Sequence, residues 1–223
     1  GKQNLARRVE AHVVAAQALL EQVAKDGPAL VALARRADRA VAAQACKGRV
    51  VVAAQQTPER RELTLIDAQT GEDRAVPVDW RSALRLQVTR ERARPCGYWL
   101  AASEGAAVRT LRLLGVQVKP MSSVRPVSVE RYDFKSVEAG QRQDGRGAIQ
   151  DQGGIVKAQV ALQAQRRRLP AGGWYVSLAQ PLAGLVTAAL EPDSQSSYVA
   201  ARLIAVPRPG EPDRLLRVMQ PVR

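Results

Sequence analysis

Apolar residues in the first 45 positions follow the spacing of an amphipathic helix. Within 5–25 they recur at intervals of three and four, which gathers them on one helix face; they are Leu5, Val9, Val13, Ala16, Leu19, Leu20 and Val23. The same spacing resumes over 29–45. Between the two segments, Asp26-Gly27-Pro28 has the residue types that stop a helix. The pattern therefore predicts a hairpin of two helices over residues 1–47, which is also a candidate for the end of a preceding domain.

After Gly48 the apolar spacing changes to that of strands. Short β-branched or alternating segments at 49–54, 62–67, 74–80 and 83–90 predict four antiparallel strands, with a turn at 70–73. Further strands are expected at 97–100, 116–120, 126–137, 155–162, 174–178 and 215–219, and short helices at 106–114 and 181–190. The 198–206 segment fits either a helix start or a strand.

The predicted fold class is therefore α+β: an N-terminal helical hairpin followed by a mainly antiparallel β region with two or three short helices. Residues 48–223 are predicted to form one α+β accessory domain. Within it, 140–154 is rich in Gly, Gln and Asp and has little to bury. That composition predicts a mobile loop.

The chain is strongly basic. It has 34 Lys and Arg against 21 Asp and Glu, a net charge of +13. Such a surplus suits phosphate contacts in nucleic-acid binding, but an Arg- and Ala-rich coding bias produces it as well, and net charge bears on solubility more than on function. The densest clusters are the candidate anion-binding residues: Arg90, Arg92, Arg94, Arg166, Arg167 and Arg168. The sequence has no pattern of alternating aromatic residues for base stacking and no helix-turn-helix pattern.

Histidine and cysteine are too few for most catalytic devices. A zinc site usually needs three or four His, Cys or carboxylate ligands at characteristic spacings, whereas His12 is the only histidine and lies in a predicted helix. The sequence thus predicts no catalytic residue, metal site or cofactor in this chain. Cys46 and Cys96 fit either a disulfide or two free thiols, because bridge formation depends on their distance.

Two further expectations concern membranes. No apolar run approaches the roughly 18 residues that cross a bilayer, so no membrane span is predicted. The first residues, Gly1-Lys2-Gln3-Asn4, lack the apolar core of a signal peptide. The sequence is equally compatible with a mature or trimmed form of a secreted protein.

Three stretches carry a resemblance to a known family. They are 94–118, with RPCGYWLA at its start and LRLLGVQV at its end; 169–185, LPAGGWYVSLAQPLAGL; and 190–194, LEPDS. In this order they resemble the region that follows the catalytic domain in bacterial zinc carboxypeptidases of the carboxypeptidase A superfamily. The segment Leu5–Val9 resembles the helix after that family's catalytic glutamate, and 49–90 carries no motif of the family.

The resemblance implies a function for the chain. The family holds zinc with an HxxE pair and a later His, and uses a separate Glu as general base; none of these maps here. The chain is then expected to be a non-catalytic C-terminal accessory domain. It would pack on the catalytic domain of the same polypeptide, which would hold the zinc, and shape access for a peptide or cell-wall substrate. A periplasmic or secreted location is slightly favoured. The alternative is a basic anion- or nucleic-acid-binding module, with nucleic acid the less favoured partner.

Physical considerations give the family-like residues a structural role. The turn 170–173 and the apolar strand after it are expected to be scaffold, with Trp174 buried. An accessory domain should also expose an apolar patch where its partner belongs. The expected patch comprises the helical pair at 5–45 and the strand face around Trp99.

Overall fold

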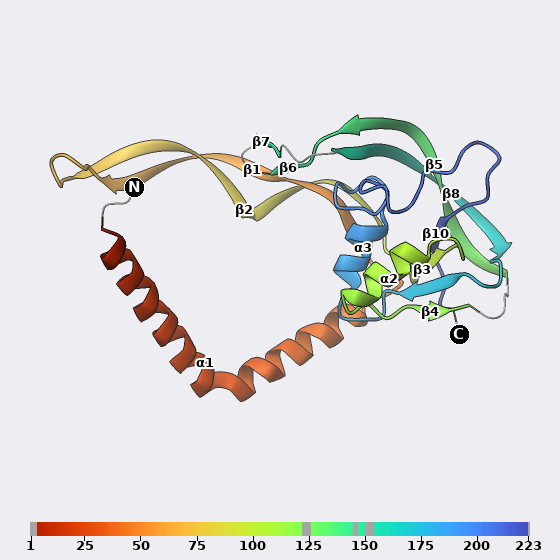
Figure 1. Ribbon diagram of the computed structural model, residues 1–223, viewed down its shortest axis with the longest axis horizontal. Helices are drawn as coiled ribbons and strands as arrows, with labels where there is room; N and C mark the ends of the chain where they lie inside the picture. Colours follow the sequence, from red (N-terminus) through yellow and green to blue (C-terminus); the bar gives the residue numbers. More distant parts are fainter. Residues whose placement is uncertain (1–3, 122–125, 145–146, 150–153, 223) are drawn as a thin grey trace.

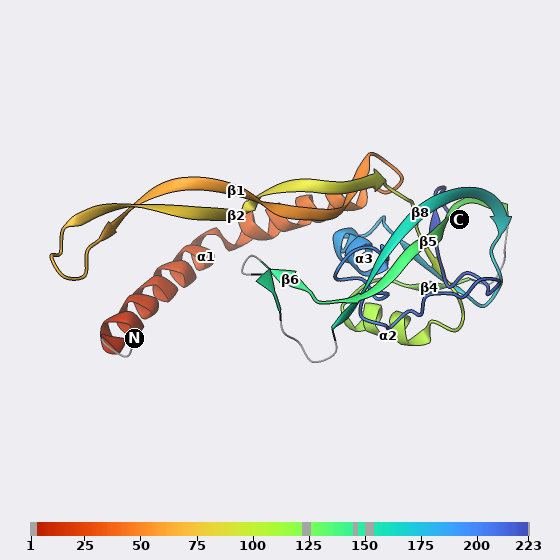
Figure 2. The same cartoon turned by 90° about the horizontal axis from the view of Figure 1, so that it is seen from above.

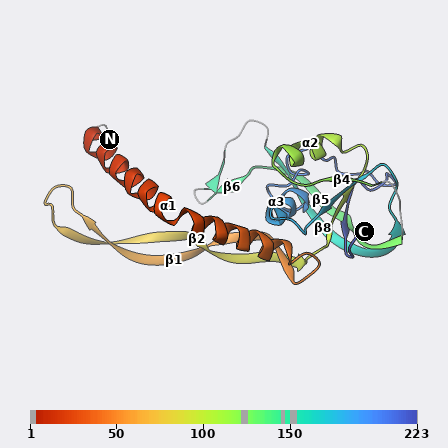
Figure 3. The ribbon, with the colours of Figure 1, turned by 90° about the horizontal axis from the view of Figure 1, so that it is seen from below.

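A computed structural model describes residues 4–121, 126–144, 147–149 and 154–222. Two long arms extend from a body of sheet and short helices (Figure 1). One arm is the helix α1, Leu5–Ala42, and the other is a hairpin of β1, Arg49–Ile66, and β2, Asp73–Ala93. Seen from above and below, both arms leave the body in the same general direction (Figures 2 and 3). The α+β class is confirmed.

The predicted pair of N-terminal helices is wrong. Residues 5–42 form one helix of 38 residues with Pro28 inside it, and the ribbon bends midway along its length (Figure 1). A proline within a helix removes one backbone hydrogen bond and clashes with the carbonyl four residues earlier, which kinks a helix without necessarily ending it. Strong helix formers continue after Pro28, so Asp26-Gly27-Pro28 gives a bend instead of a turn between two helices.

The four strands predicted over 49–90 are the two halves of β1 and β2. These strands pair antiparallel from Arg49↔Ala93 to Ile66↔Asp73, with register shifts at Val51/Ala53, Ala53/Ala54 and Gln56/Thr57. The predicted turn is confirmed and closes the hairpin at its far end. There the Asp67 carboxylate accepts hydrogen bonds from the backbone N–H of Gln69, at 2.8 Å, and of Thr70. Gly71 has a φ of 74°, which glycine adopts without strain.

The body is built on a six-stranded sheet in the order β4-β9-β3-β10-β5-β8. Every neighbouring pair is antiparallel. Its strands are β3 (Gly97–Leu100), β4 (Lys119–Pro120), β5 (Pro126–Gly140), β8 (Ile155–Arg168), β9 (Trp174–Ser177) and β10 (Leu215–Val218). All six lie where the sequence predicts strands, although β4 is shorter than expected. The 198–206 segment consists of turns and bends and is neither helix nor strand.

Two short helices cover one face of this sheet. They are α2, Gly105–Leu113, and α3, Ala183–Leu190, and both match predicted helices. The main core lies between these helices and the sheet and includes Tyr98, Leu100, Val108, Leu111, Val176, Val186 and Leu190. A smaller apolar cluster on the opposite sheet face includes Trp99, Val129, Leu169, Leu216 and Val218.

The predicted mobile loop contains a small pairing. Strand β6, Gln143–Asp144, pairs with β7, Gly147–Ala148. Residues 145–146 and 150–153 lie outside the described residues, so the structure addresses only part of the prediction for 140–154.

A disulfide fixes the roots of the two arms. Cys46, just after α1, bonds to Cys96, just before β3, with their Cα atoms 4.2 Å apart. The backbone N–H of Cys46 also donates to the carbonyl of Pro95, and that of Arg94 donates to Gly48. The question that the sequence leaves open is thereby answered: the two thiols are bridged, and the bridge holds the end of α1 against the start of the sheet.

Candidate functional site

Over most of its length, the helix α1 has an apolar face that no described part of the chain covers. None of its residues is buried. Leu5 is 64% exposed, Leu20 68% and Leu30 43%. At 100° per residue these three positions lie within about 80° of one another around the helix. Isolated exposed leucines are ordinary in proteins, but an aligned row of them marks a contact surface.

This apolar face continues into the core of the body. Val41 lies on the same side of α1 as Leu5 and Leu30, and it packs, with Ala45, against the main core cluster. The row of apolar side chains is therefore partly buried at its C-terminal end and exposed over the rest of its length. A partner that covered the exposed part would extend the protein's own hydrophobic core.

The hairpin arm also exposes apolar side chains. Leu86 and Val88 alternate along β2 and so point to one face; Leu84 lies in the register shift opposite Gln56/Thr57 and is 97% exposed. Trp80, further out on the same strand, lies under the guanidinium of Arg61, which is 5.3 Å from the ring centroid. Together with α1, the hairpin gives the body two projecting surfaces with apolar stripes.

Ion pairs hold the base of the hairpin to the body. Arg92 on β2 donates to both carboxylate oxygens of Asp193, at 2.9 Å and 2.7 Å, and to Glu191 at 2.6 Å. The side chains of Asp193 and Glu191 have no exposed surface. Arg90 also pairs with Asp193. Because a two-point contact between a guanidinium and a carboxylate fixes orientation as well as distance, these contacts set the direction in which the hairpin leaves the body.

Glu191 connects the hairpin to the centre of the sheet. Its Oε1 accepts hydrogen bonds from Arg217 Nε, at 2.9 Å, and from the Tyr98 hydroxyl, at 2.7 Å. Arg217 is fully buried, pairs with Glu130 and donates to the carbonyl of Ala93 at the end of β2. Three arginines (90, 92 and 217) thus meet three carboxylates (130, 191 and 193), and no net charge is buried.

The network shifts the pKa values of its members. Burial by itself lowers the pKa of Arg92, but the hydrogen bonds that Arg92 donates to Asp193 and the charge of Glu191 outweigh it and raise that pKa. Arg217 behaves in the same way: the charge of Glu191 is the largest influence that raises its pKa. Burial, followed by the charge of Glu191, raises the pKa of Tyr98 and of Tyr132 well above their ordinary value. The arginines stay charged and these tyrosines stay protonated.

The six candidate anion-binding arginines are not brought together. Arg90 and Arg92 join the buried network, and Arg94 donates to the backbone carbonyl of Arg49. Arg167 pairs with Asp213, which Arg131 also binds. Arg166 and Arg168 are exposed on β8. Three of the six cations are thus engaged by carboxylates of this chain, which leaves less free positive charge than their sequence clustering indicates.

The carboxylates of this network are not among the site residues predicted from the sequence. The stretch 190–194, LEPDS, is singled out only as a family-like motif, yet Glu191 and Asp193 receive four of the network's ion pairs. The available signal was two acidic residues within a short turn of a strongly basic chain. Their partners, Arg92 and Arg217, are about 100 and 26 residues away in sequence, a separation that no local pattern reveals.

Two expectations about tryptophans need correction. Trp99 was placed in an exposed apolar patch, but it is 2% exposed and belongs to the second apolar cluster. Neighbouring residues of β3 point to opposite faces of the sheet, and Tyr98 and Leu100 pack in the main core while Trp99 packs in the second cluster, so both faces of β3 are covered. Trp174 was predicted to be buried and is only partly so; it packs against the main core while Arg112 lies 4.9 Å from its ring centroid.

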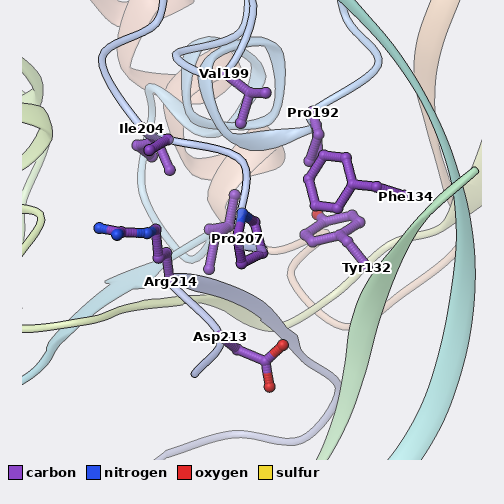
Figure 4. A pocket seen from close by; sticks show the side chains of 10 residues that line it. Tyr132, Phe134, Pro192, Val199, Ile204, Pro207, Asp213 and Arg214 are labelled. Atoms are coloured by element: carbon purple, nitrogen blue, oxygen red, sulfur yellow. The ribbon is translucent and has the colours of Figure 1, made fainter. Parts of the chain in front are cut away.

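One enclosed apolar pocket lies between β5 and the 192–215 region. Its lining includes Tyr132, Phe134, Ile204 and Pro207 (Figure 4), and its volume is about 10 Å³. Such a space holds at most one water molecule. The pocket is therefore a packing defect of the core and not a site for a substrate.

Two further properties concern metals and membranes. Within the described ranges, no three His, Cys, Asp or Glu side chains are grouped so that they could hold a metal ion. No helix in this part of the chain combines the length and the hydropathy needed to cross a bilayer.

Comparisons with protein-family models, with curated proteins and with solved structures find no match to this chain.

Proposed function

We propose that the chain is a non-catalytic accessory domain that docks through α1 and the β1–β2 hairpin on another domain of the same polypeptide. The observation that carries this proposal is the apolar face of α1, which runs for about 55 Å at 1.5 Å per residue and has no buried residue. A helix whose stability depends on covering its apolar face requires a partner along its length.

The partner we propose is a zinc carboxypeptidase-like catalytic domain, whose substrate entrance this domain would shape. That part of the proposal rests on the motifs at 94–118, 169–185 and 190–194. The buried network supports an accessory role, because Glu191 and Asp193 of the third motif hold the hairpin arm in place. The zinc, and a peptide or cell-wall substrate, would then belong to the partner domain.

The disulfide bears on the cellular compartment in which we propose that the parent protein is found. Structural disulfides such as Cys46–Cys96 persist in oxidising compartments and are rare in the cytosol. A periplasmic or secreted parent protein agrees with this bridge.

The test compares two matched variants of α1. Val9 lies on the apolar face and Val14 lies on the opposite side, and they are similarly exposed, 53% and 59%. Val9→Glu should weaken binding to the separately expressed catalytic domain at least tenfold, whereas Val14→Glu should leave it unchanged. Circular dichroism checks that both variants keep their helix content. Equal binding by the two variants would refute docking through this face.

The same titration addresses the second candidate, an anion- or nucleic-acid-binding module, which the net charge of +13 favours. Docking on a protein through apolar contacts should depend weakly on salt. Oligonucleotide binding should fall linearly and steeply on a double-logarithmic salt plot. Steep salt-dependent binding of an oligonucleotide, with no affinity for the catalytic domain, would replace the first proposal with the second.

A further inference from the structure

The strand β8 has one edge with which no strand in the described part of the chain pairs. The order of the six-stranded sheet ends in β10-β5-β8, and β8 pairs with β5 from Gly140↔Ile155 to Pro126↔Arg168. In the views from above and below, the C-terminal half of β8 lies along the outer rim of the body (Figures 2 and 3). With 14 residues, β8 is much longer than the usual strand of about five or six residues. Proteins commonly shorten or cover an edge of this kind, because its backbone groups can pair with another chain.

Other parts of the chain use the first half of this edge. The backbone N–H of Val156 donates to the carbonyl of Ala200, at 2.9 Å. The carbonyl of Val160 accepts from Arg92 Nη2, at 3.5 Å. Over 161–168, no backbone hydrogen bond to a segment other than β5 is found among the described residues. The free part of the edge is therefore the C-terminal half of β8.

The pairing register shows which backbone groups point outward. The N–H of Met219 donates to the carbonyl of Ser128, so the backbone groups of Ser128 point towards β10 and away from β8. Residues that lie opposite each other in an antiparallel pair exchange either both hydrogen bonds or neither. Arg166, which lies opposite Ser128, therefore has its N–H and carbonyl on the outer edge. The same groups of Ala164 and Leu162 follow at intervals of two, and the two edge groups that the chain itself uses belong to the same even-numbered series.

These outward groups are accessible to a partner. Ala164 is exposed, and so are Gln163, Gln165 and Arg166. Because the side chain of alanine is only a methyl group, the exposure of Ala164 leaves its backbone within reach of solvent. The side chain of Leu162 packs against the main core cluster, which anchors the strand while its edge stays open. A ligand would meet a preformed edge and would not have to order it on binding.

The free half of the edge is cationic. The strand ends in three consecutive arginines. Arg167 shares Asp213 with Arg131, whereas Arg166 and Arg168 are exposed and have no ion pair among the described residues. One carboxylate thus serves four arginines at this end of the sheet. Such an edge repels a second copy of itself and attracts a chain that carries acidic side chains.

The backbone groups favour a polypeptide over a nucleic acid. A phosphate chain could bind the arginines, but its phosphates have no donors for the outward carbonyls of Leu162 and Ala164. An extended polypeptide presents donors and acceptors in alternation, so it can pair with both kinds of backbone group while its side chains reach the arginines.

We propose that the free edge of β8, residues 162–168, binds an extended acidic segment of a partner protein. The segment would add to the sheet as a further strand and place carboxylates beside Arg166 and Arg168. The site is formed by β8 and not by α1 or the hairpin, so it does not rest on the docking proposed for those two arms.

The test is a calorimetric titration of the whole chain, at low salt, with an acetylated, amidated octapeptide of alternating Glu and Val. One control peptide has Lys in place of each Glu. The other keeps the sequence but carries N-methyl groups on two adjacent central residues, which removes one N–H from each edge of the peptide. We expect binding of the first peptide and at least tenfold weaker binding of both controls. No binding of the first peptide, or equal binding of either control, overturns the proposal.

Two variants of Ala164 locate the site. Ala164→Pro removes an N–H that points outward, so the hydrogen bonds between β8 and β5 remain, and proline is tolerated at such positions of edge strands. It should weaken peptide binding at least tenfold. Ala164→Val keeps the N–H and should bind within twofold of the wild type. Circular dichroism and the denaturant midpoint check that both variants are folded, and equal affinities of the two folded variants would contradict strand addition.

A second pair of variants keeps the test decisive if proline disturbs the strand. The double variant Arg166→Gln, Arg168→Gln should weaken peptide binding about tenfold at low salt. The double variant Arg35→Gln, Arg36→Gln removes the same charge from exposed positions of α1 and should have no effect. An unchanged affinity in the β8 variant would refute the assignment. So would tighter binding of a thymidine oligonucleotide than of the Glu-Val peptide.

Discussion

The guanidinium of Arg92 binds both oxygens of the Asp193 carboxylate, 101 residues later in the chain. This contact joins the root of the hairpin arm to the turn after α3. The side chain of Asp193 has no exposed surface at this contact. Removing either charge would therefore leave the other one buried without its partner and would greatly reduce the stability of the fold. The direction of the arm and the stability of the body therefore depend on the same few side chains.

Replacing Arg92 should destabilise the fold. Arg92→Met leaves Asp193 and Glu191 with less positive charge in a buried site, and breaking such a pair on one side typically costs about 3–5 kcal/mol. Denaturant unfolding measures the change. Arg49→Met is the control, because its pair with Glu91 is exposed on both sides and such pairs contribute little. Similar midpoints for the two variants would mean that the Arg92 network does not hold the body together.

The stability should fall at alkaline pH. The chain has four tyrosines, and burial raises the pKa of each one, Tyr98, Tyr132, Tyr175 and Tyr198. The folded state keeps its phenolic protons where the unfolded chain loses them, so the contribution of these tyrosines to stability is constant below their ordinary pKa of about 10 and declines above it. Ultraviolet absorbance of tyrosinate should rise together with loss of circular dichroism. Tyrosinate that forms while the fold is intact would show that these hydroxyls are accessible.

Truncating Trp99 should cost more than truncating Trp174. Trp99 is 2% exposed, and replacing a buried Trp by Ala typically costs about 3–5 kcal/mol. Trp174 is partly exposed and should cost less, with part of the loss coming from its contact with Arg112. Unfolding of the two alanine variants in urea gives the order, and a larger loss in Trp174→Ala would reverse this assignment of the two environments.

Removing the disulfide should loosen the junction of the arms. Cys46 and Cys96 are 50 residues apart, and a bridge over such a loop typically stabilises a fold by about 2–4 kcal/mol, chiefly by restricting the unfolded chain. The double variant Cys46→Ser, Cys96→Ser should unfold at lower denaturant than the oxidised protein. A reducing agent should lower the wild-type midpoint to the same value and leave the variant unchanged. A wild-type midpoint that resists full reduction of the bridge would argue against its stabilising role.

The local patterns of the sequence determined most of the elements and the α+β class. The strands around Tyr98, Val129 and Leu216, the helices α2 and α3, and the hairpin turn predicted at 70–73 all follow from spacing and turn chemistry, which act within a few residues. The same local view failed at Pro28, because a proline signals a break without fixing whether the chain turns or bends.

Only the tertiary structure decided which distant residues meet. The contacts of Arg92 with Asp193, of Arg217 with Glu191 and of Cys46 with Cys96 all join separate segments of the chain. A charged residue has the same local signature whether it is solvated or buried against a counter-charge. The arginine clusters therefore suggested an anion site where the fold has placed internal ion pairs, and the partner carboxylates became visible only once the sheet and α3 had brought them together.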